Sequence, residues 1–264
     1  MEEVNKSRKG RITVYVIAGA LAAFLIYYAV ISVLGPVRKM ELIVNAYGPV
    51  AKENEKINEN IYTDSAYISL LKEKAYVQAK TLMAQTDSIY LAINLEDSTA
   101  AIEISGVTVH SARISSYNIS SILRNSDRNS IYNMLSQPLS VENAISTIKK
   151  EPVMIKIAPK DTSEYQPDVI PDTSIVEHVN CILEVSNGLR IYVYQEELDK
   201  PAEKGSTFRF DLRDRLNTAW SSLKSAALFR VPEYHPYIKI RIPRDDVKII
   251  YRALPRNGQI AVYT

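Results

Sequence analysis

Residues 12–34 read ITVYVIAGALAAFLIYYAVISVL, an apolar stretch that contains no charged side chain. As an α-helix, at about 1.5 Å per residue, a stretch of this length measures roughly 35 Å. The hydrocarbon core of a bilayer is about 30 Å thick. The stretch therefore predicts a membrane-spanning helix, and the organisation of the remaining chain follows from it.

The basic residues on either side of this stretch predict its orientation. Lys6, Arg8, Lys9 and Arg11 precede it, whereas only Arg38 and Lys39 follow it closely. Because the cytoplasmic flank of a span carries the excess of Lys and Arg, we expect residues 1–11 in the cytoplasm and the bulk of the chain across the membrane. A cleaved signal peptide is the alternative, although its apolar region would be shorter, about 7–15 residues, and would end in a small-residue cleavage site.

Composition narrows the compartment and the partners. The chain has 264 residues with a net charge of +2 from 32 basic and 30 acidic side chains, so no nucleic-acid partner is predicted. A single cysteine permits no internal disulfide, which is unremarkable in a bacterial periplasm. With the predicted span, we expect a single-pass protein of the bacterial inner membrane. The three histidines and the cysteine are scattered and no Gly-rich phosphate loop is present, so we expect neither a metal nor a cofactor.

The region 36–87 is predicted to be a helical stalk beside the membrane, interrupted at Gly48-Pro49 because proline lacks an amide donor. One stripe in it recurs at alternating steps of four and three residues, with Asp64 and Gln78 as polar interruptions. Its apolar members are Ile57, Ile61, Ile68, Leu71, Ala75 and Leu82. Two interpretations remain open: a coiled coil that pairs chains, or an amphipathic helix that packs on its own domain.

Residues 88–264 are predicted to form an α+β domain, mainly β-sheet. Alternating apolar residues predict a three-stranded meander over 89–114 and a hairpin over 179–193, with Asn187-Gly188 as its tight turn. The other predicted elements are a helix over 139–150, a strand over 153–158, a loop over 159–173, and a helix over 212–228. The chain then ends as strand, helix and strand over 238–263, with Asp245 and Asp246 at the start of that helix.

The apolar residues of the 212–228 helix predict its buried face. They are Leu212, Leu216, Ala219, Trp220, Leu223 and Ala227, and they recur at helical spacing.

Two blocks of the sequence resemble a known family. The first is the terminal run Ile240-Arg241-Ile242-Pro243-Arg244-Asp245-Asp246-Val247-Lys248, followed by Tyr251, Pro255 and Asn257-Gly258; the second is the 89–114 meander. Over about fifty residues in total, they are similar to L,D-transpeptidase (YkuD-type) catalytic domains. The resemblance implies a periplasmic domain of that fold and contact with peptidoglycan.

The family's catalytic motif, Ser-His-Gly-Cys-Ile-Arg, is not preserved here. When Arg241 is aligned with the motif's arginine, Lys239 takes the place of the nucleophilic cysteine and Tyr237 that of the histidine. The chemistry requires a thiolate, which an exposed, protonated lysine does not replace. Tyr237, Lys239, Arg241 and the nearby His235 therefore form the surface of a degenerate site.

The other candidate reactive residues have structural explanations. Cys181 shares a strand face with Val179, Leu183 and Val185, so we expect a small buried hydrophobe. His178 lies three residues away, on the opposite face of the strand. His110 has no obvious partner in the sequence.

The sequence therefore predicts a non-catalytic protein that is anchored in the membrane, a pseudoenzyme relative to the family it resembles. We expect a scaffold or binding subunit of a cell-envelope complex, such as a secretion or motility complex, with partners among envelope proteins, peptidoglycan, or other copies through the stalk. The alternative is an active peptidoglycan-modifying enzyme whose catalytic residues the alignment misplaces.

Overall fold

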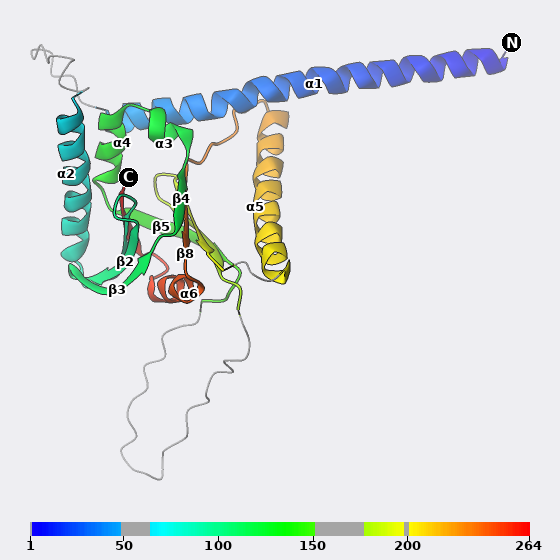
Figure 1. Ribbon diagram of the computed structural model, residues 1–264. Helices are drawn as coiled ribbons and strands as arrows, with labels where there is room; N and C mark the ends of the chain where they lie inside the picture. Colours follow the sequence, from blue (N-terminus) through cyan, green and yellow to red (C-terminus); the bar gives the residue numbers. More distant parts are fainter. Residues whose placement is uncertain (1, 49–63, 151–176, 198–200) are drawn as a thin grey trace, which may run out of the picture.

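A computed structural model describes residues 2–48, 64–150, 177–197 and 201–264, with side chains from Val14 onwards except Ala202. A single long helix, α1 (Glu2–Tyr47), leads into a sheet-rich α+β domain (Figure 1). Helix α1 runs unbroken through Pro36 and ends at Tyr47, just before Gly48-Pro49. It is, within the described chain, the one helix that is long and apolar enough to cross a membrane.

The domain is built on one nine-stranded sheet in the order β3-β2-β1-β9-β5-β6-β7-β8-β4. Its strands are β1 (Ile89–Asn94), β2 (Thr99–Ile104), β3 (Val107–Arg113), β4 (Ser116–Ile119), β5 (Leu139–Ser146), β6 (Asn180–Val185), β7 (Arg190–Gln195), β8 (Tyr237–Ile242) and β9 (Gln259–Tyr263). Its helices are α2 (Ser65–Ala84), α3 (Ser121–Asn125), α4 (Arg128–Leu135), α5 (Pro201–Ala227) and α6 (Arg244–Ala253).

Three predicted units are confirmed. The meander β1-β2-β3 is antiparallel throughout. The hairpin β6-β7 turns at Asn187-Gly188, where Gly188 has φ +75°. The chain ends as β8-α6-β9, with Asp245 and Asp246 in the first turn of α6, where carboxylates favourably meet the positive end of the helix dipole.

The predicted helix over 139–150 is wrong, because residues 139–146 form strand β5. Leu139 and Ser140 pair with β9, whereas Val141 to Ser146 pair with β6 across a bulge. Strand β5 thus joins the two halves of the sheet, and this pairing outweighs a weak local helix signal. Elements β4, α3 and α4 arise where no regular structure was predicted. The predictions for 153–158 and 159–173 lie outside the described residues.

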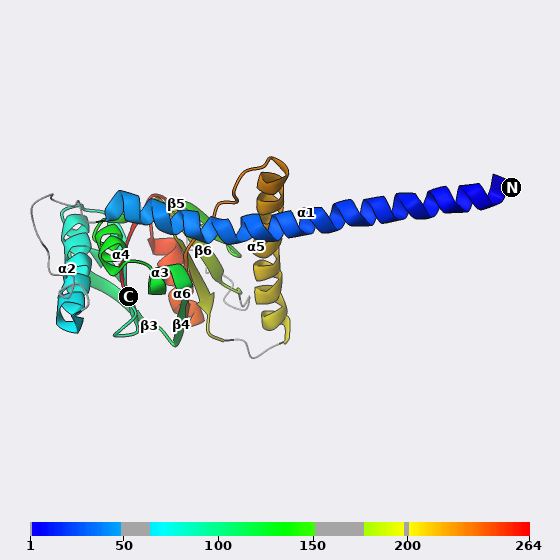
Figure 2. The same ribbon diagram turned by 90° about the horizontal axis from the view of Figure 1, so that it is seen from above.

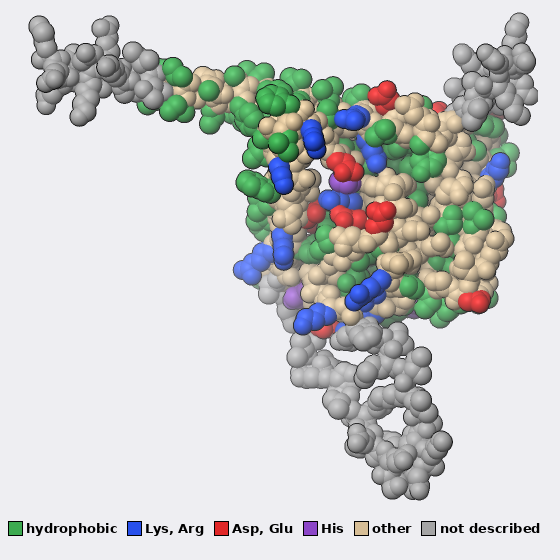
Figure 3. Space-filling view, turned by 180° about the vertical axis from the view of Figure 1, so that it is seen from behind, with side chains coloured by type: hydrophobic (Ala, Val, Ile, Leu, Met, Phe, Trp, Pro, Cys, Tyr) green, Lys and Arg blue, Asp and Glu red, His purple; other side chains and the backbone are tan. Residues whose placement is uncertain are grey.

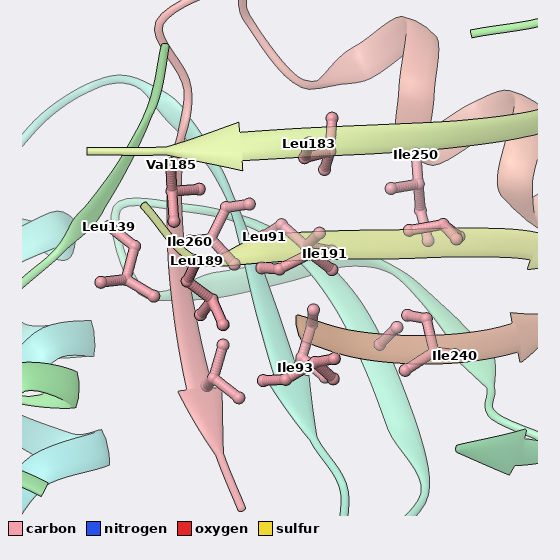
Figure 4. Packing of buried hydrophobic residues seen from close by; sticks show 14 of the residues in the cluster. Leu91, Ile93, Leu139, Leu183, Val185, Leu189, Ile191, Ile240, Ile250 and Ile260 are labelled. Atoms are coloured by element: carbon pink, nitrogen blue, oxygen red, sulfur yellow. The ribbon is translucent and has the colours of Figure 1, made fainter. Parts of the chain in front are cut away.

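The main core lies between the two halves of the sheet. Inward-facing residues of β1 and β9 meet those of β6, β7 and β8, together with side chains of α4 and α6. Figure 4 shows Leu91, Ile191 and Ile240 converging from β1, β7 and β8. Ile43, near the end of α1, is buried in the same core. The last turns of α1 are therefore part of the domain.

Helix α2 packs on the outer face of β1 and β9. Ala79 and Met83 are buried against Tyr90 and Ala261. Of the predicted stripe, Ala75 is buried and Ile68 and Leu71 are half-buried, whereas Leu82 is exposed; Ile57 and Ile61 lie outside the described residues. The structure thus shows α2 packing on its own domain, and pairing of chains remains a prediction.

Helix α5 packs on the outer face of the other half of the sheet, over β6, β7 and β8. It is longer than predicted and its predicted buried face is wrong. Leu212, Leu216, Trp220 and Leu223 are all exposed, as are Ala219 and Ala227. Apart from Phe210, which packs against Ile182 and the tyrosines of β7, the side that faces the sheet is mostly polar, as described below.

Candidate functional site

A polar and aromatic layer separates α5 from the sheet. In β7, residues alternate between the two faces, so that Ile191 and Val193 enter the core while Tyr192 and Tyr194 face α5. Strand β8 pairs with β7 in parallel, with Lys239 beside Tyr192. The same alternation in β8 places Tyr237, Lys239 and Arg241 on the α5 side.

The two phenols are each held by an aspartate of α5. The Tyr192 hydroxyl donates to Asp214 Oδ2 at 2.9 Å, and the Tyr194 hydroxyl donates to Asp211 Oδ1 at 2.6 Å. Burial, followed by the charge of Asp214, raises the pKa of Tyr192 to about 12. Burial and the hydrogen bond to Asp211 raise the pKa of Tyr194 as well. Both phenols therefore stay protonated at neutral pH and serve as hydrogen-bond donors.

Arg190 completes the layer at the start of β7. Its guanidinium lies 2.7 Å from Glu184 and 3.5 Å from Asp214, and it donates to Thr218 Oγ1 at 3.3 Å. Asp214 thus interacts with both a phenol and a guanidinium. This network fixes the polar side of α5 on the sheet.

Lys239 lies at the centre of a cleft in this layer. Its Nζ is 4.7 Å from the ring centroid of Tyr192 and 5.1 Å from that of Tyr237, a cation–π arrangement. On one side is a cavity of about 410 Å³ that is also bounded by Tyr28 and Ser32 of α1. On the other is a cavity of about 320 Å³ that reaches Tyr117 of β4.

The structure brings the four residues of the predicted degenerate site close to these cavities. Tyr237 and Lys239 line both, His235 lines the first, and Arg241 lines the second. His235 is bound to the hairpin turn, with Nδ1 3.1 Å from the carbonyl oxygen of Gly188. The arrangement presents ammonium, guanidinium and phenol donors beside aromatic faces, which suits the binding of a carboxylate-bearing or sugar-like ligand.

Cys181 is placed as predicted, in the core rather than in the cleft. It is 1% exposed, and burial raises the pKa of its thiol to about 12. His110, in contrast, has a partner that the sequence did not reveal: its Nε2 lies 2.9 Å from Asp246 Oδ1 of α6. Within the described ranges, no group of three or more His, Cys, Asp or Glu side chains is arranged to hold a metal ion.

Several cleft residues were missed from the sequence. Thr207, Asp211, Asp214 and Thr218 recur at steps of three and four residues, which is a polar stripe with helical spacing. The stripe was visible, but the apolar residues on the opposite side of the same helix were assigned to the core. Comparison of the chain with protein-family models, with curated proteins and with solved structures gave no match.

Proposed function

We propose that this protein is a membrane-anchored, non-catalytic binding or scaffold subunit whose domain lies in the bacterial periplasm. The observation that carries the proposal is that one end of α1 is exposed and apolar while the other end is buried in the domain. Every side chain from Val14 to Ile26 is exposed and most are apolar, whereas Ile43 is buried in the core of the domain. An anchor that is continuous with the core holds the domain at a fixed position relative to the membrane.

Further contacts join α1 to the domain between these two regions. Lys39 Nζ donates to the carbonyl oxygen of Asn187 at 2.9 Å, in the β6-β7 turn. A Cβ on Gly35 would lie 3.0 Å from the carbonyl oxygen of Pro232, so the backbones approach closely there. Such a junction suits a scaffold, because it transmits orientation as well as location.

The cleft around Lys239 is the proposed binding surface. Its donors and aromatic rings match the carboxylates and sugars of peptidoglycan, and the partial likeness to L,D-transpeptidases favours the same ligand. The second proposed binding partner of the cleft is a protein of a secretion or motility complex. The proposed non-catalytic character is supported by Cys181, which is buried away from the cleft, and by Lys239 at the position that the resemblance aligns with the family's nucleophile.

Topology is tested with a membrane-impermeant maleimide in a Cys181→Ala background. We expect labelling of Gln137→Cys, which is exposed on the domain, in cells with a permeabilised outer membrane, and labelling of Ser7→Cys only after lysis. The reverse pattern would contradict the proposed orientation.

Binding is tested by pull-down of the tagged full chain in mild detergent. Envelope proteins or wall fragments should co-purify, less so with Lys239→Ala and equally with the control Arg113→Ala, an exposed residue of β3. Cross-linking or trimming of muropeptides by the purified protein, lost in Lys239→Ala, would instead establish an enzyme.

A further inference from the structure

Helix α5 has its two faces inverted relative to an ordinary surface helix. The side toward the sheet carries half-buried polar residues, among them Thr207, Asp211, Asp214, Thr218 and Ser222. The side away from the sheet carries Phe208, Leu212, Leu216, Trp220 and Leu223. Leu216 is 60% exposed and Trp220 is 71% exposed. A continuous apolar stripe of this kind marks an interaction surface.

The charges of α5 are sorted in the same way. Its acidic residues face the domain: Asp211 and Asp214 bind the tyrosines, and Glu203 is buried against Arg244 at 3.0 Å. Its basic residues are exposed beside the apolar stripe, namely Lys204, Arg209, Arg213, Arg215 and Lys224. Figure 3 shows Lys and Arg side chains gathered on the side of the body from which α1 projects. An apolar face with a basic border is typical of helices that lie in an anionic membrane surface.

The position of α5 relative to α1 fits that surface. In Figures 1 and 2, α5 runs crosswise to α1. Its first and last turns lie at the same position along the axis of α1. If α1 crosses the bilayer, α5 therefore lies parallel to the membrane plane. The N-terminal part of α1 extends away on the side of α5 opposite to the sheet, which is the side of its apolar face.

The contact between α1 and α5 determines how deeply α5 would lie in the bilayer. The Tyr27 hydroxyl donates to the carbonyl oxygen of Ala226 at 3.2 Å, and the rings of Tyr27 and Phe229 are 5.6 Å apart. Tyr27 precedes Leu34, the end of the uncharged stretch, by roughly 10 Å of helix. Interfacial helices bury their apolar face about 5–10 Å into the boundary between headgroups and acyl chains. The depth set by α1 and the depth that α5 requires therefore agree.

We propose that α5 lies in the membrane surface on the domain's side, with its outer face immersed among anionic lipids. The proposal rests on the proposed function, in which α1 spans the bilayer. It explains why the helix turns its polar residues inward, since its outer face has an apolar environment of its own. The domain then has a second membrane attachment and cannot rotate away from the bilayer about α1.

Trp220 is the chain's single tryptophan, so its fluorescence reports on this face alone. The full-length protein is reconstituted in phosphatidylcholine vesicles with and without phosphatidylglycerol. We expect blue-shifted emission that brominated acyl chains quench and aqueous iodide does not, with stronger bromine quenching when the anionic lipid is present. Leu216→Glu should shift the emission to the red and restore iodide quenching. Leu70→Glu is the matched control, since Leu70 is 66% exposed on α2 and its substitution should leave the signal unchanged.

Flotation of the vesicles separates this proposal from the one on which it rests. Protein that fails to float after carbonate washing contradicts the membrane anchor itself. Protein that floats, yet has Trp220 quenched by iodide and not by bromine, overturns only the interfacial placement of α5. Protection from both quenchers also overturns it, because the outer face is then covered by protein.

Discussion

At the scale of single residues, the layer between sheet and helix shows how buried polar groups define a site. A buried hydroxyl without a partner costs free energy, and here each phenol of β7 finds a carboxylate of α5. The pairings also fix the rotation of α5 about its axis. The sequence pattern of β7 predicted which residues face outward, but it held no information about which helix would meet them.

Replacement of Tyr192 by phenylalanine tests this layer through its pH dependence. The pKa of Tyr192 rises from 10.0 to about 12 on folding, so the folded state holds the phenolic proton more tightly. The associated stability is present below pH 10 and is lost as the pH rises through 12. We expect Tyr192→Phe to cost about 1 kcal/mol at neutral pH, from the lost hydrogen bond, and to flatten the alkaline loss of stability. Equilibrium unfolding at pH 8 to 12, with the exposed Tyr117→Phe as control, measures both; an unchanged alkaline slope would contradict the assignment.

At the scale of elements, those whose structure is decided by local pattern could be predicted from the sequence, and those decided by long-range pairing could not. The meander and the Asn187-Gly188 hairpin are local, and both were predicted. Strand β5 exists because β6 and β9 lie on either side of it, which no window around residues 139–146 reveals. Helix α5 was correctly predicted as a helix, but its buried and exposed faces were predicted the wrong way round. An apolar stripe does not indicate whether the domain or another surface covers it. The surface around Lys239 was predicted from a family resemblance. Its aspartates, Asp211 and Asp214, were identified only from the folded structure.

Two glycines in different elements should respond oppositely to alanine. Gly188 has φ +75°, and a Cβ there would lie 2.8 Å from Lys39 Nζ, so Gly188→Ala should destabilise the protein by about 1–2 kcal/mol. Gly205 lies within α5 with nothing within 4 Å of an added Cβ, so Gly205→Ala should stabilise it by about 0.5–1 kcal/mol. Thermal unfolding in mild detergent compares them. Equal effects would mean that the β6-β7 turn does not depend on its left-handed backbone.

At the scale of the whole molecule, the proposed anchor and the domain share one helix. Residues 14–26 of α1 are exposed and Tyr27 contacts the end of α5, whereas later turns of α1 line the cavity, hold the β6-β7 turn and fill the core. The boundary between the proposed membrane span and the domain therefore falls inside α1 rather than at its end. A domain defined from the first strand onwards would lack part of its own core.

This boundary is tested in a chain that begins at Gly35 and so lacks the predicted span. We expect it to fold, because it keeps Lys39 and Ile43. Within it, Ile43→Ala should cost about 2–5 kcal/mol, as for other buried aliphatic side chains, since Ile43 is 3% exposed in the core. Leu42→Ala, at the exposed neighbouring position, should change stability by no more than about 0.5 kcal/mol. Equal costs in urea unfolding would show that the last turns of α1 are not packed on the domain, and the anchor would then be a flexible tether rather than a fixed support.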